Sequence, residues 1–311
     1  MHRSHFERLA KSLSATYRLI DLLGSGGAAH VYVAVERKTG RRVAIKALRE
    51  EEATNLCATR FLAEIDIVAQ LDHRNIVPLL GSGTADGLPY YVMPFITGQS
   101  LRSQLEQRGR LPLREVLDIC ADVSAALDYA HDRRVVHRDI KPENILFHEG
   151  RALVVDFGIA FALDTVAHPR WTMAGASLGT PDYMSPEQAQ GDGLVNGRSD
   201  VYSLACVAYE MLWGRPPFTG TARVVLLRHI AAEPMPLGCR LPGLPQSVSA
   251  AVCRALAKPP SGRYATAGAF VNAMRRGLPT ELAPSAPSRV ADPRSLHSPL
   301  WDSRMVVGTG H

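Results

Sequence analysis

The spacing of apolar residues changes near residue 97, and this change constrains the fold more than any other feature of the chain. Upstream, residues 17–48 alternate apolar and polar positions around glycine-containing turns, a pattern typical of three antiparallel strands. Apolar residues within 58–71 recur at helical spacing, and the side expected to face the core carries Phe61, Ile65, Val68 and Leu71. Two further strands are expected at about 76–83 and 89–95. This part therefore predicts a small antiparallel sheet with one main helix.

Downstream of that point, helical spacing dominates. Helices are expected at about 100–107, 113–132, 199–213, 221–231, 247–256 and 266–276. Short strands are expected between them at about 135–136, 145–147 and 153–155. Residues 1–16 are polar and are expected to be flexible, and the Pro- and Ser-rich residues 278–311 are expected to form a disordered tail. The sequence thus predicts an α+β domain over 17–277, with a small N-terminal lobe (17–96) and a larger, mostly helical C-terminal lobe (97–277).

Composition and charge exclude several classes of protein. Of the 311 residues, 46% are hydrophobic, which is enough to build a sizeable core. The net charge of +5 comes from scattered basic residues without a basic stripe, so no nucleic-acid partner is expected. The chain has no window of about 18 apolar residues and no signal-peptide pattern, which predicts a cytoplasmic protein without a membrane span. Five cysteines without a C-x-x-C pair indicate free thiols in a reducing compartment.

Lysine usage draws attention to two positions. Only five of the 35 basic residues are lysines, and two of these are Lys46 and Lys141. Lysine and arginine are not interchangeable where a compact ammonium must sit among phosphates. Lys46 ends an apolar strand segment that begins at Val43, and an ammonium aimed at phosphates would need a carboxylate partner. Glu64, on the first expected helix, is available, although a surface charge explains either residue taken alone.

A glycine-rich segment stands between the first two expected strands. Its glycines would let backbone N–H groups approach phosphates, but a plain hairpin turn explains the same pattern. No helix follows the segment and no G-K-[ST] occurs, which argues against a dinucleotide fold and against a Walker-type loop. The segment consists of Leu23, Gly24, Ser25, Gly26, Gly27, Ala28, Ala29, His30 and Val31.

Residues 137–144, His-Arg-Asp-Ile-Lys-Pro-Glu-Asn, form the strongest motif of the chain. Three groups in this run are suited to phosphate chemistry. The Asp139 carboxylate can accept a hydroxyl proton, the Lys141 ammonium can neutralise a phosphate in transfer, and the Asn144 oxygen can ligate Mg²⁺. Because all three precede an expected strand within one loop, the run predicts a catalytic loop.

A second carboxylate follows the next expected strand, in the run Asp156-Phe-Gly. Asp156 at a strand end is suited to bind Mg²⁺, although an aspartate capping a turn gives the same pattern. After a segment without clear periodicity, residues 179–187 have the sequence Gly-Thr-Pro-Asp-Tyr-Met-Ser-Pro-Glu.

Taken together, these motifs resemble those of the protein kinases, in the same order and at similar distances over about residues 17–277. The resemblance is greatest to the bacterial, eukaryotic-like serine/threonine kinases, with Lys141 and the Gly-Thr-Pro run implying serine and threonine as acceptors. It implies that Asp139 is the catalytic base, that Lys141 contacts the γ-phosphate, and that Thr180 bridges these two residues. It further implies that Lys46, paired with Glu64, holds the α- and β-phosphates, and that the metal ligands are Asn144 and Asp156.

The resemblance also implies roles outside the phosphate site. The adenine ring would lie between Val31, Ala44 and Leu146, and the hinge would be formed by Met93, Pro94 and Ile96. Asp200 would anchor the catalytic loop. Glu187 would form a structural ion pair with Arg263. Arg138 would meet a phosphate on the activation segment, where the candidate hydroxyls are Thr165, Thr172 and Ser177.

The implied activity is ATP-dependent phosphorylation of serine and threonine in protein substrates, with autophosphorylation of the activation segment. The implied cofactors are ATP and Mg²⁺, with Mn²⁺ as an alternative metal, and a homodimer would allow autophosphorylation in trans. The alternative is a pseudokinase that binds nucleotide and acts as a signalling scaffold. The chain departs from the kinase pattern at Ala29, where the third glycine is usual, and at Ser185, where alanine is usual, and neither change removes a charge.

Overall fold

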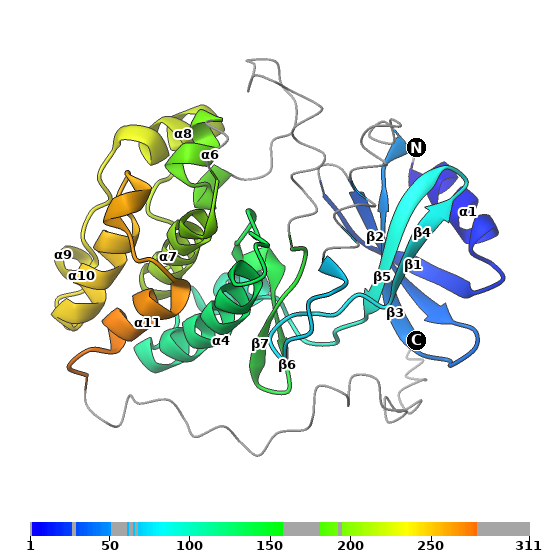
Figure 1. Ribbon diagram of the computed structural model, residues 1–311, viewed down its shortest axis with the longest axis horizontal. Helices are drawn as coiled ribbons and strands as arrows, with labels where there is room; N and C mark the ends of the chain where they lie inside the picture. Colours follow the sequence, from blue (N-terminus) through cyan, green and yellow to red (C-terminus); the bar gives the residue numbers. More distant parts are fainter. Residues whose placement is uncertain are drawn as a thin grey trace.

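The computed structural model describes residues 2–26, 29–50, 61, 65, 68–157, 181–191 and 195–278. Figure 1 shows two lobes, a β-rich N-terminal lobe and a larger helical C-terminal lobe, as the change in apolar spacing predicts. Within the described residues, no helix is both long enough and apolar enough to cross a membrane.

The N-terminal lobe is built on a five-stranded antiparallel sheet with the order β1-β2-β3-β5-β4. The strands are β1 (Tyr17–Ser25), β2 (Ala29–Glu36), β3 (Arg42–Leu48), β4 (Gly81–Ala85) and β5 (Leu88–Pro94). Lys46 of β3 pairs with Val31 of β2 on one side and with Tyr91 of β5 on the other. This register places Lys46 in the central strand of the sheet.

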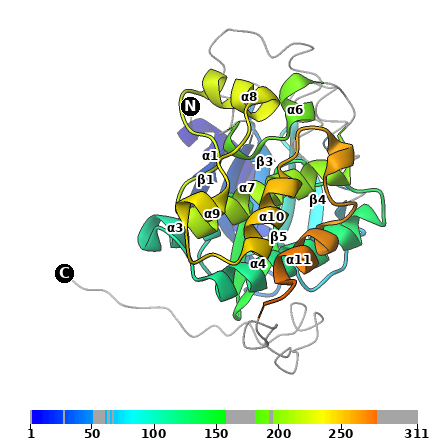
Figure 2. The same cartoon turned by 90° about the vertical axis from the view of Figure 1, so that its left-hand side faces the viewer.

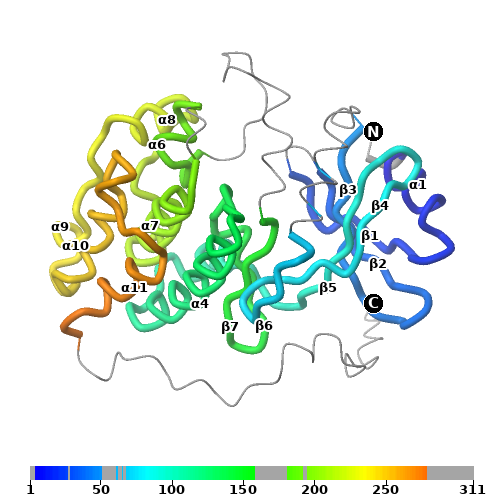
Figure 3. The backbone as a smooth tube through the Cα atoms, viewed as in Figure 1, coloured from blue at the N-terminus to red at the C-terminus, as the bar shows by residue number. Residues whose placement is uncertain are grey.

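The expectation that residues 1–16 are flexible is wrong. Residues His2–Ser12 form helix α1, which lies against the sheet (Figures 1 and 3). Leu9 and Leu13, one helical turn apart, are buried in an apolar cluster with β2, β3 and β5. Two buried leucines outweigh the polar composition of the segment, because burial of one helical face is enough to hold an amphipathic helix.

In the segment between β3 and β4, the expected buried apolar residues are present, but the expected strand begins later than predicted. Phe61, Ile65, Val68 and Leu71 are all buried in the main core, as expected. The strand expected at 76–83 begins only at Gly81. Ile76 forms an isolated parallel bridge with Val154, and Val77 N donates to the Val154 carbonyl at 3.0 Å. The backbone of these residues is therefore paired with the C-terminal lobe and cannot extend β4.

The C-terminal lobe contains a short hairpin and a set of helices. The hairpin pairs β6 (Ile145–His148) with β7 (Arg151–Val154). The helices are α3 (Leu101–Arg108), α4 (Leu113–His131), α6 (Pro186–Gln190), α7 (Gly197–Trp213), α8 (Ala222–Ala231), α9 (Leu237–Arg240), α10 (Gln246–Ala255) and α11 (Ala267–Arg275). The strand expected at 135–136 does not form, because Val135 N donates to the Ala130 carbonyl and closes the end of α4.

Helix α7 lies at the centre of the lobe, surrounded by other helices in the view of Figure 2. Every residue from Ser199 to Leu212 is buried, so the helix is covered on all sides. Helix α11 packs on α4 and α7, and Leu278, just beyond it, packs against the same core. The folded lobe therefore includes position 278, which the sequence assigns to the tail, and the rest of that tail lies outside the described residues.

Candidate active site between the lobes

Lys46 and Asp156 form a salt bridge where the two lobes meet. The Lys46 Nζ lies 2.8 Å from Oδ2 of Asp156, which follows β7. Tyr91, the β5 neighbour of Lys46, donates a 2.5 Å hydrogen bond from its hydroxyl to Asp156 Oδ1. An ammonium and a phenol of the N-terminal lobe thus contact both oxygens of one carboxylate of the C-terminal lobe.

These contacts keep Asp156 ionised. Burial disfavours its charged form, but the Lys46 ammonium and the hydrogen bonds from Lys46 and Tyr91 outweigh burial, so the pKa of Asp156 lies below its ordinary value of 3.8. Burial and the facing carboxylate raise the pKa of Tyr91 well above 10, so its hydroxyl stays a donor. Asp156 also has a φ of 64°, a strained conformation for a non-glycine residue that these contacts help to maintain.

Asp139, Lys141 and Asn144 come together in one loop before β6. Lys141 Nζ lies 2.7 Å from Asp139 Oδ2, and Asn144 Nδ2 donates to the Asp139 carbonyl at 2.8 Å and to Oδ2 at 3.0 Å. Burial lowers the pKa of Lys141, but the Asp139 carboxylate outweighs it and raises that pKa above 10.5. The Asp139 side chain remains 37% exposed, so a second molecule can reach it.

His137 connects this loop to the strand that leads to Asp156. The ring is fully buried, and burial lowers the pKa of His137, so the ring is neutral near pH 7. Its Nε2–H donates to the Val155 carbonyl at 2.9 Å, and its Nδ1 accepts from Asp139 N at 3.2 Å. Its ring centroid lies 4.6 Å from that of Phe157. One neutral imidazole therefore fixes the distance between the Asp139 loop and the Asp156 segment.

Asp200 holds the backbone of the same loop from the first turn of α7. Its carboxylate is fully buried and accepts from His137 N and from Arg138 N, each at 2.8 Å. His131 contributes a third contact, with Nε2 2.7 Å from Asp200 Oδ2. Arg138 has a φ of 68°, and Gln188 Nε2 donates to its carbonyl at 2.7 Å. Contacts from α6 and α7 thus hold a strained loop conformation.

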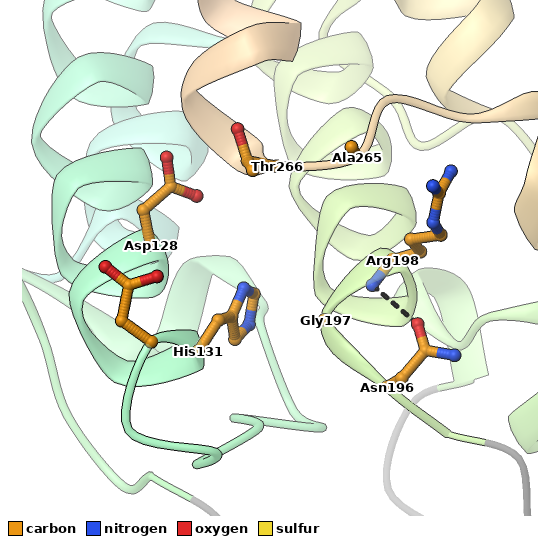
Figure 4. Close-up of a pocket in the computed structure, with 8 residues that line it drawn as sticks. Asp128, His131, Asn196, Gly197, Arg198, Ala265 and Thr266 are labelled. Atoms are coloured by element: carbon orange, nitrogen blue, oxygen red, sulfur yellow. Dashed lines mark hydrogen bonds between the residues drawn. The ribbon is translucent and has the colours of Figure 1, made fainter.

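His131 also lines a polar cavity between α4, α7 and the start of α11 (Figure 4). The cavity has a volume of about 440 Å³, and Asp128 and Thr266 contribute to its wall. None of Lys46, Asp139 and Asp156 lines it. The cavity is therefore separate from the site between the lobes.

The ion pair expected between Glu187 and Arg263 is present. The guanidinium donates from Nη1 and Nη2 to the two carboxylate oxygens at 2.7 and 2.8 Å, and Ser199 Oγ donates to Glu187 Oε1 at 2.5 Å. Burial would raise the pKa of Glu187, but the bonds from Arg263 and Ser199 outweigh it, so that pKa lies below 4.5. The pair joins α6 to the segment before α11.

An apolar cluster lies beside the salt bridge. Ile96 and Val77 are buried with Leu153 and Val155, and the residues packed against this group are Met93 and Leu146. Ala44 is 3% exposed and pairs with Met93 in the β3–β5 register. Of the residues expected around adenine and in the hinge, Ala44 on β3, Met93 on β5, Leu146 on β6 and Ile96 after β5 therefore lie near each other, and Pro94 is the last residue of β5. Val31 lies on β2, where it pairs with Lys46.

The described residues of the glycine-rich segment lie at the end of β1 and the start of β2, where Gly26 N donates to the Ala29 carbonyl at 2.9 Å. Leu23 is 54% exposed, and Ser25 Oγ accepts from Arg49 Nη2 at 2.7 Å. The structure corrects the expectation that His30, within this segment, faces the nucleotide. Its ring is buried and lies 5.0 Å from the ring of His5 on α1, because side chains alternate along β2 and turn His30 away from the face that carries Val31.

Several expected site residues lie outside the described residues. They are Gly27, Ala28, Glu64, Thr165, Thr172, Ser177 and Thr180. The expected partner of Lys46 is among them, and the partner that the structure shows is Asp156.

Sequence reasoning missed three residues that support the site, Tyr91, His131 and Gln188. Tyr91 had a usable signal, because a residue paired with Lys46 on the neighbouring strand faces the same side of the sheet. His131 and Gln188 gave no such signal, since their partners Asp200 and Arg138 are 69 and 50 positions away in the chain.

Comparison with known proteins agrees with this architecture. The model of the protein kinase domain family matches residues 17–251. The chain is 41% identical over 283 residues to a probable serine/threonine-protein kinase PknB of Bifidobacterium longum, covering 86% of this chain and 41% of the relative. It is 40% identical over 264 residues to the serine/threonine-protein kinase PrkC of Bacillus subtilis, covering 83% of this chain and 40% of the relative. The chain belongs to the protein kinase family.

A solved structure gives the same result for the fold. The kinase domain of Mycobacterium tuberculosis PknI, crystallised as a single cysteine-to-alanine mutant, superposes with a TM-score of 0.68 at 29% identity, covering 84% of this chain and 95% of that one. The fold is therefore the two-lobed protein kinase fold. The chain spans about two fifths of the length of the curated relatives named above.

Proposed function

We propose that this chain transfers the γ-phosphate of ATP to serine and threonine hydroxyls of proteins. The observation that carries the proposal is the arrangement of Asp139, Lys141 and Asn144 in one loop, joined through His137 to the segment of Asp156. The family match and the names of the relatives, which are serine/threonine-protein kinases, support the same activity.

The residues present fit a nucleotide and a divalent cation. A Cβ at Gly24 would meet no atom within 4 Å, so packing inside the protein does not require glycine there, whereas close approach of a phosphate would. Asn144 uses Nδ2 toward Asp139, which leaves its Oδ1 for a metal ion. Val155 N donates to the Asn144 carbonyl at 3.0 Å, which keeps Asn144 near Asp156. An amide oxygen and a carboxylate are ligands that Mg²⁺ prefers.

In this proposal each side chain has one task in phosphoryl transfer, where alignment and charge placement provide most of the catalysis. Asp139 orients the attacking hydroxyl and accepts its proton. Lys141 and Lys46 place positive charge beside the phosphate oxygens. Mg²⁺, when held by Asn144 and Asp156, neutralises further charge on the phosphates.

The same proposal includes control by phosphorylation. Arg138 lies beside Asp139, and contacts from Asp200 and Gln188 fix its backbone. Its side chain therefore extends from a fixed point of the loop. A phosphate on Thr172 or Ser177 would carry about two negative charges and would bind such an arginine. Incubation with ATP and Mg²⁺ followed by mass spectrometry would locate the modified hydroxyl. Absence of any phosphate between residues 160 and 180 would contradict this part.

The activity is tested with the purified full chain, ATP, Mg²⁺ and a mixture of peptides that contain serine, threonine or tyrosine. We expect phosphate on serine and threonine, and a loss of about 10²- to 10⁴-fold in the Asp139→Asn variant, which keeps the size of the side chain but not the base. ATP binding by that variant should be retained. A chain that binds ATP and transfers no phosphate would be a pseudokinase.

A further inference from the structure

Helix α1 covers the face of the sheet opposite to the one that carries Lys46. Along β3, the alternate residues Val43, Ile45 and Ala47 lie in one apolar cluster with Leu9 of α1 and with Leu13, the residue that follows the helix. Lys46, between two of these residues, faces the other side of the sheet and contacts Asp156. The strand that presents the phosphate-binding lysine is therefore packed against α1 along its rear face.

His5 of α1 holds the end of this strand. Its ring is 4% exposed, Nε2–H donates to the Leu48 carbonyl at 2.9 Å, and Nδ1 lies 2.7 Å from the Tyr32 hydroxyl. Leu48 is the last residue of β3, two positions beyond Lys46. Because a strand rises only about 3.3 Å per residue, a bond at Leu48 constrains the Lys46 backbone about 7 Å away.

Arg8 of α1 connects two segments that leave the sheet. Its Nε donates to Asp86 Oδ2 at 2.6 Å and its Nη2 to the Asp86 carbonyl at 3.2 Å, in the turn between β4 and β5. Its Nη1 donates to the carboxylate of Glu50, which lies two residues beyond β3. One guanidinium thus joins the exit of β3 to a turn of the same lobe.

We propose that α1 acts as a strap that positions β3, and with it Lys46, for phosphoryl transfer, with His5 and Arg8 as positioning residues. This inference rests on the proposed kinase function. The competing view is that α1 only covers apolar surface. The two views differ in what they predict for the ATP site, because displacement of Lys46 weakens ATP binding, whereas loss of folded protein lowers the apparent kcat and leaves KM for ATP unchanged.

Arg8 gives a clean test because its side chain is 40% exposed, and exposed ion pairs contribute little to stability. The variants of the full chain are Arg8→Ala, His5→Ala and His5→Gln, with Arg18→Ala on the exposed side of β1 as the matched control. The glutamine at position 5 keeps a side-chain N–H donor for the Leu48 carbonyl. KM for ATP, KM for the peptide and the melting temperature are measured for each variant.

We expect Arg8→Ala and His5→Ala to raise KM for ATP by about fivefold, in the range of typical coupling between distant sites, with KM for the peptide unchanged. His5→Gln should restore most of the affinity, and Arg18→Ala should behave as the wild type. An unchanged KM for ATP in both alanine variants would overturn the strap. If the wild type transfers no phosphate, the proposed function fails. The strap is then tested separately, by comparing the dissociation constant of ATP with Mg²⁺ between the same variants and the wild type.

Discussion

The Lys46 ammonium lies 2.8 Å from the Asp156 carboxylate, and this contact joins the central strand of the N-terminal lobe to the segment that follows β7 in the C-terminal lobe. Asp156 is connected to Asp139 through the buried His137, which donates to Val155 and accepts from Asp139 N. A single chain of contacts therefore runs from Lys46 through the segment of Asp156 and His137 to the backbone of Asp139, so changes at Lys46 should alter the chemistry of Asp156.

Replacement of Lys46 by methionine should raise the pKa of Asp156. Burial opposes ionisation of this carboxyl, and the lysine is the largest of the influences that overcome it. The pKa is measured by NMR titration of the ¹³C-labelled carboxyl group. Lys38→Met, in the exposed turn between β2 and β3, is the control. An Asp156 pKa that is the same in the Lys46→Met variant and the wild type would show that the salt bridge does not form in solution.

Replacement of Tyr91 by phenylalanine removes the hydroxyl that donates to Asp156 and leaves the packing of the ring unchanged. Loss of a hydrogen bond to a partly buried charged group should cost about 1–3 kcal/mol of unfolding free energy. Chemical denaturation measures this cost. Tyr90→Phe, the adjacent and half-buried tyrosine of β5, serves as the control. Equal stabilities of the two variants would contradict the role assigned to the Tyr91 hydroxyl.

The sequence was sufficient to predict the fold class because the period of apolar residues changes from two to 3.6 between the lobes. The grouping of Asp139, Lys141 and Asn144 in one loop was also predictable, since they lie within six positions of each other. Tyr91 and His131 could not be predicted in the same way, because their partners are distant in the chain. Their roles depend on strand register and helix packing, which a local pattern does not contain.

Helix α1 and the late start of β4 show a second reason why the sequence pattern did not predict every element. The apolar residues of α1 are few, and the helix is held by a sheet that forms from residues 17 to 94. Ile76 and Val77 have the composition of a strand, but their backbone groups pair with β7. In both segments tertiary contacts override local propensity.

Replacement of Asp200 by asparagine should impair the catalytic loop more than nucleotide binding. His137 N and Arg138 N bind different oxygens of the carboxylate, Oδ2 and Oδ1, and an amide replaces one of these oxygens by an NH2 donor, so one backbone N–H loses its partner. We expect kcat to fall by about tenfold or more, with the dissociation constant of ATP nearly unchanged, as measured by calorimetry. A loss confined to ATP affinity would show that Asp200 acts elsewhere.

The buried pair of Glu187 and Arg263 should make stability depend on acidic pH. The pKa of Glu187 is below 4.5 in the folded chain, so its contribution to stability is present above pH 4.5 and is lost as the pH falls through the folded-state pKa. Glu187→Gln should cost about 3–5 kcal/mol at pH 7, because it leaves the charge of a buried guanidinium without its counter-charge.

The difference in unfolding free energy between wild type and Glu187→Gln should therefore shrink below pH 4.5. Urea denaturation from pH 7 to pH 3 measures it, and an exposed Glu106→Gln on α3 is the control. A difference that does not change with pH would mean that Glu187 has the same pKa in the folded and the unfolded chain, which would contradict the ion pair.

The central claim, that Lys46 and Lys141 meet the phosphates of ATP in one site, is tested most directly with an acyl phosphate derivative of ATP. Such a reagent transfers its acyl group to a lysine amine near the bound phosphates, and peptide mapping identifies the modified residues. Of the five lysines in the chain, we expect Lys46 and Lys141 to be acylated, and we expect excess ATP with Mg²⁺ to suppress their acylation. Equal acylation of Lys11, Lys38 and Lys258, without protection by ATP, would contradict it.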